Sequence, residues 1–182
     1  MQYSGMTGKS LTELECCVLG VVWREGPCTA YDLRKIFERS LTTSWRASTG
    51  SIYPLVRKLE KMGLVTVVAV GASKRNSRSI TITKAGLSKV RNWVCDVPDW
   101  IGEPLADPIR TRFYFLQTIA KPKREAVLEE WMSLTRAAIE AVEMEIRKFV
   151  ELEDTIETVS HQGALMQLQA RENWLAMLRP YC

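Results

Sequence analysis

The stretch STGSIYPLVRKLEKMGL, residues 48–64, decides the fold, because its pattern predicts one amphipathic helix. Its apolar residues recur every three or four positions and share one face: Ile52, Leu55, Val56, Leu59 and Met62. The other face is polar and basic: Tyr53, Arg57, Lys58 and Lys61. Hydroxyl side chains stand at the N-terminal end of the predicted helix, where backbone amides and the helix dipole attract anions: Ser48, Thr49 and Ser51. We predict a recognition helix for the DNA major groove.

Pro54 leaves two placements of the helix start open, because proline donates no backbone hydrogen bond and restricts the residue before it. In one placement the helix begins near Ser51, with Pro54 in its first turn. In the other it begins at Ser48 and bends around Gly50 to Pro54. Gly63 predicts the helix end in both cases.

Two helices are predicted before this stretch. Ser10 and Glu13 fit a capping box for the first helix, which the Gly-Pro pair at 26–27 ends. Thr29 and Asp32 fit the start signal of the second helix. Together with residues 48–64 they predict a bundle of three helices.

A β-hairpin and a further helix are predicted after it. LVTVVAV (64–70) and RSITIT (78–83) have the composition of two strands around a polar loop. Its tip is basic, which suits a minor-groove or phosphate contact, and a solvated loop with edge-protecting charges is the alternative. The next helix spans residues 84–94 and has four side chains predicted to face inward: Leu87, Val90, Trp93 and Val94.

The composition changes after residue 95. Residues 96–108 hold three prolines and four acids, which disfavours a continuous helix or strand. The predicted organisation is therefore a domain at 1–95, a linker at 96–107 and a helical domain at 108–182. The helical domain is predicted to have a short helix at 109–120, a long helix from Pro122 to about residue 154, and a final helix at 155–178.

The two long helices have apolar residues on more than one side. The longer helix shows Trp131, Leu134, Ala138, Val142, Ile146, Phe149 and Leu152, with Leu128 and Ile139 widening the stripe. The final helix shows one row of Ile156, Val159, Met166, Ala170, Trp174 and Met177, and a second of Leu165, Leu168, Leu175 and Leu178. Such helices need partners on several sides, which favours a dimer. Intramolecular docking is the alternative.

The charge distribution and the composition limit the classes of function that the chain can have. Residues 1–94 hold 15 Lys and Arg against 6 Asp and Glu, a balance of +9, whereas residues 95–182 balance at −5. The first half is thus the candidate polyanion binder, although a solvated surface also gives such a split. No apolar run approaches the roughly 20 residues that span a bilayer, and no signal pattern opens the chain, so a cytoplasmic protein is expected.

Catalysis, metals and cofactors are not expected. Five cysteines without a CxxC pair and a single histidine disfavour a zinc site, and reduced thiols fit the cytoplasm. For Cys16 and Cys17, a redox switch is the alternative to buried thiols. No nucleophile triad or phosphate-cradling glycine loop is present, so the chain is predicted not to be an enzyme.

The predicted fold is mainly α with a small β-hairpin: a winged helix-turn-helix domain followed by a helical dimerisation domain. Here the chain resembles the PadR family of transcriptional regulators over almost its whole length. The matching pieces are VLGVVWREGPCTAYDLRKI, STGSIYPLVRKLEKMGLV, RSITITKAG and DPIRTRFYFLQ, and the most diagnostic residues are Gly50, Tyr53, Pro54, Leu59, Glu60, Gly63 and Leu64. Ala30 and Ile80 depart from the usual glycine and aromatic residue, which we interpret as packing adjustments.

The resemblance implies a homodimer with DNA-binding wings at its edges, held together by a helical region like that of the longer, phenolic-acid-responsive branch. Family members are mostly repressors, and some are released from operators by small aromatic or amphiphilic ligands. Two recognition helices related by a two-fold axis would enter successive major grooves about 34 Å apart, so the expected operator is an inverted repeat. The alternative function is a winged-helix protein-interaction module that does not bind DNA.

Each candidate residue has an expected role. Ser51, Tyr53 and Arg57 face the groove; Lys35, Arg46, Lys58 and Lys61 hold phosphates; Lys74, Arg75 and Arg78 grip the flanking backbone or minor groove. Tyr53 could instead be a packed aromatic with its hydroxyl satisfied locally. An effector pocket is expected from Trp93, Trp100, Phe113 and Tyr114, for which core packing is the alternative.

Overall fold

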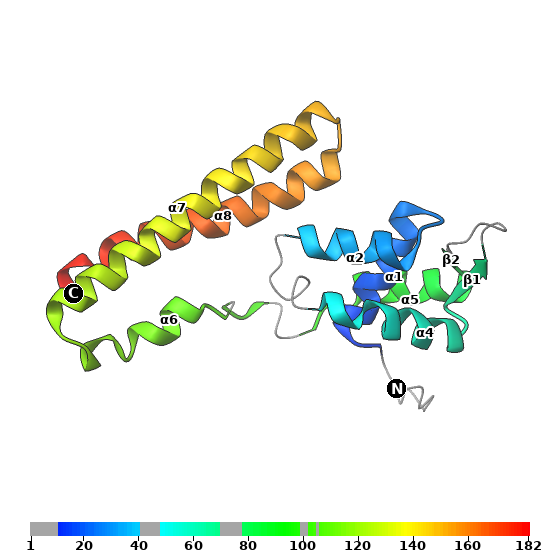
Figure 1. Cartoon of the computed structure of the whole chain (residues 1–182), viewed down its shortest axis with the longest axis horizontal. Helices are drawn as coiled ribbons and strands as arrows, with labels where there is room; N and C mark the ends of the chain where they lie inside the picture. Colours follow the sequence, from blue (N-terminus) through cyan, green and yellow to red (C-terminus); the bar gives the residue numbers. More distant parts are fainter. Residues whose placement is uncertain (1–10, 41–47, 70–77, 99–101, 105) are drawn as a thin grey trace, which may run out of the picture. The chain divides into compact units, whose positions relative to one another are not determined.

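A computed structural model describes residues 11–40, 48–69, 78–98, 102–104 and 106–182 of the chain. The chain divides into two compact units, residues 1–102 and 103–182, and the division falls within the predicted linker. Figure 1 shows the helices and strands of each unit. Within the described ranges, no helix combines the length and the apolar character that crossing a membrane requires.

The first unit has the element order of a winged helix-turn-helix. Its elements are α1 (Glu13–Glu25), α2 (Ala30–Arg39), the 3-10 turn η1 (Thr49–Ser51), α4 (Ile52–Lys61), β1 (Val65–Ala69), β2 (Arg78–Ile82) and α5 (Lys84–Cys95). Helix α1 lies at the centre and contacts α2, α4, β2 and α5. The most deeply buried side chains of this core are Val18, Leu19, Val22, Leu33, Phe37, Ile52, Leu59 and Ile80. The predicted fold class is confirmed.

The capping box of α1 is at Thr12 and Glu15, so its predicted placement at Ser10 and Glu13 is wrong. The Thr12 hydroxyl accepts from the Glu15 N–H, and the Glu15 carboxylate accepts from the Thr12 N–H at 3.0 Å. Two overlapping Thr/Ser-x-x-Glu patterns fit the sequence equally. The observed one puts Glu15 inside the unit, where it has a second partner on α4. The predicted cap of α2 at Thr29 and Asp32 is confirmed.

Helix α4 begins at Ile52 after the turn η1, so Pro54 stands in its first turn and the first of the two predicted starts is correct. Its buried face holds Ile52, Val56 and Leu59, with Leu55 partly buried. Met62 was expected on this face but is 42% exposed. The helix has ended at Lys61 and the chain turns at Gly63 with φ of 68°, which directs Met62 away from the core.

The wing is an antiparallel pair in which Val65 faces Ile82 and Val67 faces Ile80. The segment between α1 and α2 joins it, because Cys28 and Ile80 exchange two backbone hydrogen bonds of 3.2 and 2.8 Å. Ile80 is 1% exposed. This position therefore belongs to the core of the unit, which agrees with our interpretation of Ile80 as a packing adjustment.

Thr83 and Gly86 connect the end of the recognition helix to α5. The Thr83 hydroxyl accepts from the Gly86 N–H at 3.0 Å and lies 2.8 and 3.1 Å from the carbonyls of Gly63 and Leu64. A Cβ on Gly86 would lie 2.1 Å from the Leu64 carbonyl oxygen, so only glycine fits there. Of the side chains expected inward on α5, Val94 is 68% exposed, because the core beneath this helix ends with Trp93.

The second unit is helical. Its elements are α6 (Pro108–Phe113), η3 (Leu116–Thr118), α7 (Lys121–Glu151), α8 (Thr155–Met177) and η4 (Arg179–Tyr181). The single helix predicted at 109–120 is wrong, because the chain breaks between Phe113 and Leu116. The break lets Phe113 pack edge-on against Trp174 and Tyr181 while Leu116 enters the core.

Helices α7 and α8 form a hairpin (Figure 1) that uses only part of their apolar surface. Its buried α7 residues are Leu128, Met132, Thr135 and Val142. Two of these, Leu128 and Val142, belong to the predicted stripe, whereas its members Leu134 and Leu152 are 63% and 65% exposed. On α8 the second predicted row faces α7, with Leu175 fully buried. Four members of the first row are between 59% and 70% exposed: Ile156, Val159, Met166 and Met177.

Candidate nucleic-acid interface

The outer face of α4 is the candidate interface. At about 100° per residue, Pro54, Arg57 and Lys61 follow one line on the side opposite Ile52, Val56 and Leu59. Tyr53 and Lys58 stand on the two flanks of that line, and these five outer residues surround a surface hollow: Tyr53, Pro54, Arg57, Lys58 and Lys61. Tyr53 is 49% exposed, so this side chain is available to a ligand in the hollow rather than packed in the core.

The start of α4 differs from the starts of its neighbours. Helices α1 and α2 each begin with a capping box, whereas neither η1 nor α4 has a side-chain cap, and no acid stands in the first turn of α4. The turn from Ser48 to Ser51 is closed by a backbone hydrogen bond of 2.9 Å. An approaching anion thus meets the positive end of the helix dipole without a competing carboxylate in that turn.

Lys58 has an internal partner that the sequence did not predict. Its ammonium group donates to Oε1 of Glu15 on α1, while its side chain stays 48% exposed and the Glu15 side chain is 3% exposed. Burial raises the pKa of Glu15, but hydrogen bonds from Lys58 and Thr12 outweigh this effect and hold the pKa below its usual value. Glu15 is therefore ionised at neutral pH. A buried acid in the apolar run ELECCVLG is the one sequence signal that could have indicated this contact.

Other candidate DNA contacts lie on α2 and the wing. Lys35 is exposed on α2, with its ammonium group 4.6 Å from the centre of the Tyr31 ring. Arg78 is exposed at the start of β2. Arg46, Lys74 and Arg75 lie outside the described residues.

The candidate pocket residues have separate packing partners. Trp93 is half-buried against the core of the first unit, and its indole N–H donates to Glu13 at 2.9 Å. Phe113 packs within the second unit, and Tyr114 is 80% exposed. Trp100 lies outside the described residues. For Trp93 and Phe113, the contacts are those of the core-packing alternative.

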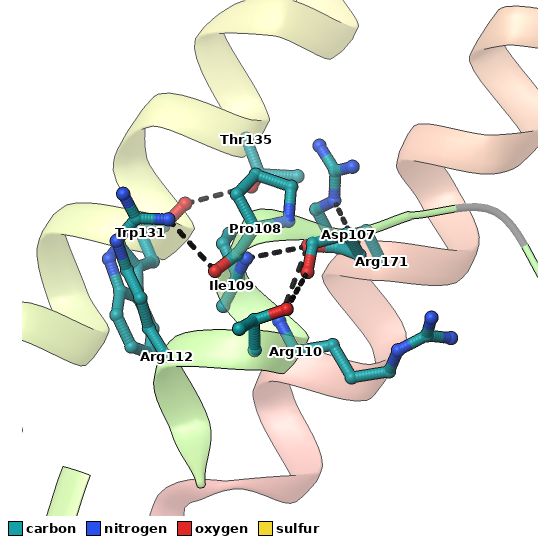
Figure 2. Close-up of polar contacts among 9 residues, drawn as sticks. Asp107, Pro108, Ile109, Arg110, Arg112, Trp131, Thr135 and Arg171 are labelled. Atoms are coloured by element: carbon teal, nitrogen blue, oxygen red, sulfur yellow. Dashed lines mark hydrogen bonds and ion pairs between the residues drawn. The ribbon is translucent and has the colours of Figure 1, made fainter. Parts of the chain in front are cut away.

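A polar cluster at the start of α6 was also not predicted (Figure 2). Asp107 accepts from the N–H groups of Ile109 and Arg110, at 2.8 and 3.3 Å, and from Nε of Arg171 on α8 at 2.8 Å. Burial raises the pKa of Asp107, but these hydrogen bonds and the Arg171 charge together hold it below its usual value. Arg112 donates back to the Pro108 carbonyl at 2.9 Å. Asp107 thus fixes the start of α6 on α8.

The two adjacent cysteines of α1 have the contacts of the buried-thiol alternative. Cys16 and Cys17 are buried, and burial raises the pKa of Cys16 and brings that of Cys28 to about 11, so both thiols stay protonated at neutral pH. Among the residues that the structure describes, no three His, Cys, Asp or Glu side chains gather as a metal site would require.

The first unit, with its basic helix α4 and its wing, defines a winged helix-turn-helix protein. Residues 18–92 match the model of the transcriptional regulator PadR-like family. A curated relative, the negative transcriptional regulator PadR of Bacillus subtilis (strain 168), is 23% identical over 127 residues, 69% of each chain. The winged helix-turn-helix unit of this chain therefore matches the PadR-like family of transcriptional regulators over residues 18–92. The family consists of regulators, which confirms the prediction that the chain is not an enzyme.

Solved structures share the fold. The crystal structure of Bacillus subtilis PadR in complex with operator DNA matches with a TM-score of 0.82 at 20% identity, covering 92% of this chain and 96% of that one. The same protein in complex with p-coumaric acid matches with a TM-score of 0.72 at 20% identity, covering 91% and 92%. At this identity the match establishes the winged-helix fold with carboxy-terminal helices.

Proposed function

We propose that this chain is a homodimeric repressor that inserts α4 into the major groove of an inverted-repeat operator. The observation that carries the proposal is the outer face of α4, where Arg57 and Lys61 stand beside Tyr53 above a helix start without a side-chain cap or an acid. The relative bound to operator DNA supports the same use of the fold. Arg78 and the wing would hold the flanking backbone.

The test is selection of bound sequences from a random DNA pool, followed by titration of the selected site at fixed salt. We expect an inverted repeat with half-site centres about one helical turn apart. An electrophoretic shift at low salt with random genomic fragments separates this proposal from a protein-interaction module. A purified chain that shifts neither selected nor random DNA would contradict the proposal.

Dimerisation is proposed through the apolar row of α8 that the hairpin leaves outside. Ile156, Val159, Met166 and Met177 form this row, each at least 59% exposed. A second copy related by a two-fold axis would bury them, because contiguous exposed apolar surface favours association.

The dimer is tested with Met166→Asp, which places a charge in the row, against Gln167→Asp on the neighbouring flank of α8. We expect light scattering to give a dimer for the unchanged chain and for Gln167→Asp, and a monomer for Met166→Asp. A dimer that survives Met166→Asp would place the interface elsewhere.

A small aromatic or amphiphilic effector is the third part of the proposal. The relative solved with p-coumaric acid supports it. Tryptophan fluorescence during a screen of phenolic acids should show quenching by a bound ligand. Silence across the screen would indicate a regulator without such an effector.

A further inference from the structure

Glu15 is the one charged residue that is buried among the described parts of the chain, at 2% exposure. Each carboxylate oxygen has a partner: Oε2 accepts from the Thr12 N–H, and Oε1 accepts from the Lys58 ammonium. The second contact links α1 to α4 across 43 positions of sequence. A buried carboxylate without these partners would be strongly unfavourable, so the contact constrains where the Lys58 side chain can lie.

Lys58 differs in this respect from the other two cations of the hollow. In the described part of the chain, no ion pair is formed by Arg57 or Lys61. The charge of Lys58 is instead balanced by Glu15 within hydrogen-bonding contact. Because the flank of α4 that holds Lys58 faces α1, the same contact fixes the rotation of α4 about its own axis.

We propose that Glu15 is a positioning residue for DNA binding: it holds Lys58 on α1, sets the orientation of α4, and removes one cation from the charge that α4 presents to phosphates. The inference rests on the proposed function and replaces the expectation that Lys58 is a phosphate contact. Arg57 and Lys61 then carry the charge of the interface, and Lys58 acts as an internal tie.

This assignment predicts how salt weakens binding. Log affinity falls with log salt concentration, and each phosphate charge that a protein neutralises makes this slope steeper by about 0.9. The slope is given below as its magnitude. Lys61→Gln should therefore lower the slope by about 0.9, whereas Lys58→Gln should leave it unchanged. Glu15→Gln keeps a side chain that can complete the capping box but frees Lys58, so the slope should rise by about 0.9.

The experiment measures fluorescence anisotropy of a random-sequence duplex with the full chain at several salt concentrations. It compares the unchanged chain with Glu15→Gln, Lys58→Gln, Lys61→Gln and the double variant Glu15→Gln/Lys58→Gln. We expect the double variant to return to the slope of the unchanged chain, since it loses one acid and one base together. A loss for Lys58→Gln equal to that for Lys61→Gln overturns the inference while DNA binding itself stands.

Urea unfolding of the same proteins tests the contact between Lys58 and Glu15 in the absence of DNA. Either single substitution should lower the midpoint, and the second should lower it little further, because the interaction is already lost. Additive losses in the double variant would overturn the inference. Failure of the unchanged chain to bind DNA would overturn the proposed function, and this inference with it.

Discussion

The two units bury their apolar residues in different ways. Of the nine most completely buried large side chains in the described residues, eight belong to the first unit, and only Leu175 belongs to the second. The second unit instead leaves a row of apolar side chains on the outside of α8. The first unit therefore gathers its apolar residues in one central core, whereas the second leaves a row of them on a surface that is suited to a partner.

The strongest test of this comparison is Gly86→Ala in the first unit. The added Cβ would meet the Leu64 carbonyl, and backbone cannot yield as a side chain does, so we expect a loss of about 3 kcal/mol or more in unfolding free energy. If the units are independent, the helical hairpin should keep its circular dichroism while the first unit unfolds. Gly20→Ala is the matched control, since nothing lies within 4 Å of its Cβ position.

The substitution Arg57→Ala separates DNA binding by the first unit from dimerisation by the second. We expect affinity for the selected operator to fall by about 1 to 3 kcal/mol, because a groove contact is lost, with the dimer unchanged in light scattering. Arg147→Ala, the same substitution at an exposed position of α7, is the control for charge. Equal operator affinities for Arg57→Ala and the unchanged chain at fixed salt would remove Arg57 from the interface.

Thr12→Ala has a smaller expected effect, confined to the first unit. It removes the hydroxyl that caps α1 and should cost about 1 kcal/mol of unfolding free energy. Thr29→Ala, the equivalent change at the cap of α2, provides the comparison. If Thr12→Ala lowers the free energy of unfolding by less than Thr29→Ala does, burial of Glu15 does not strengthen the cap of α1.

Acid should weaken the second unit through Asp107. Its lowered pKa means that the folded state binds the proton less readily, so its contribution is full above the unfolded value of about 3.9 and is lost as pH falls through the folded pKa. The Tm difference between the unchanged chain and Asp107→Asn should therefore shrink as pH falls below about 4. A difference that stays constant into acid would show that the Arg171 contact does not depend on the charge.

Local signals explain why much of the fold could be predicted from the sequence. The cap at Thr29, the turn at Gly63 and the alternation around Ile80 each lie within a few residues of the structure they specify. The errors arise where several local patterns are equivalent. Thr12 and Ser10 both fit a capping box, and α8 carries two apolar rows, so only tertiary packing decides between them.

The candidate interface was less predictable than the fold. Helical periodicity placed Tyr53, Arg57 and Lys61 on the outer face of α4, but it treated Lys58 as their equivalent. The contact of Lys58 with Glu15 depends on how α4 crosses α1, and no spacing in the sequence encodes it. The same holds for Asp107 and Arg171, which are 64 positions apart.

The Thr83 hydroxyl has a mechanical consequence. It lies within hydrogen-bonding distance of the carbonyls of Gly63 and Leu64 while it caps α5, and Gly86 is in direct contact with the same strand of backbone. The residues that follow α4 and the start of α5 are thus held together at one point by hydrogen bonds and a close backbone contact. A rotation of α5 should therefore move the end of α4 with it, because a displacement of one relative to the other would break these hydrogen bonds.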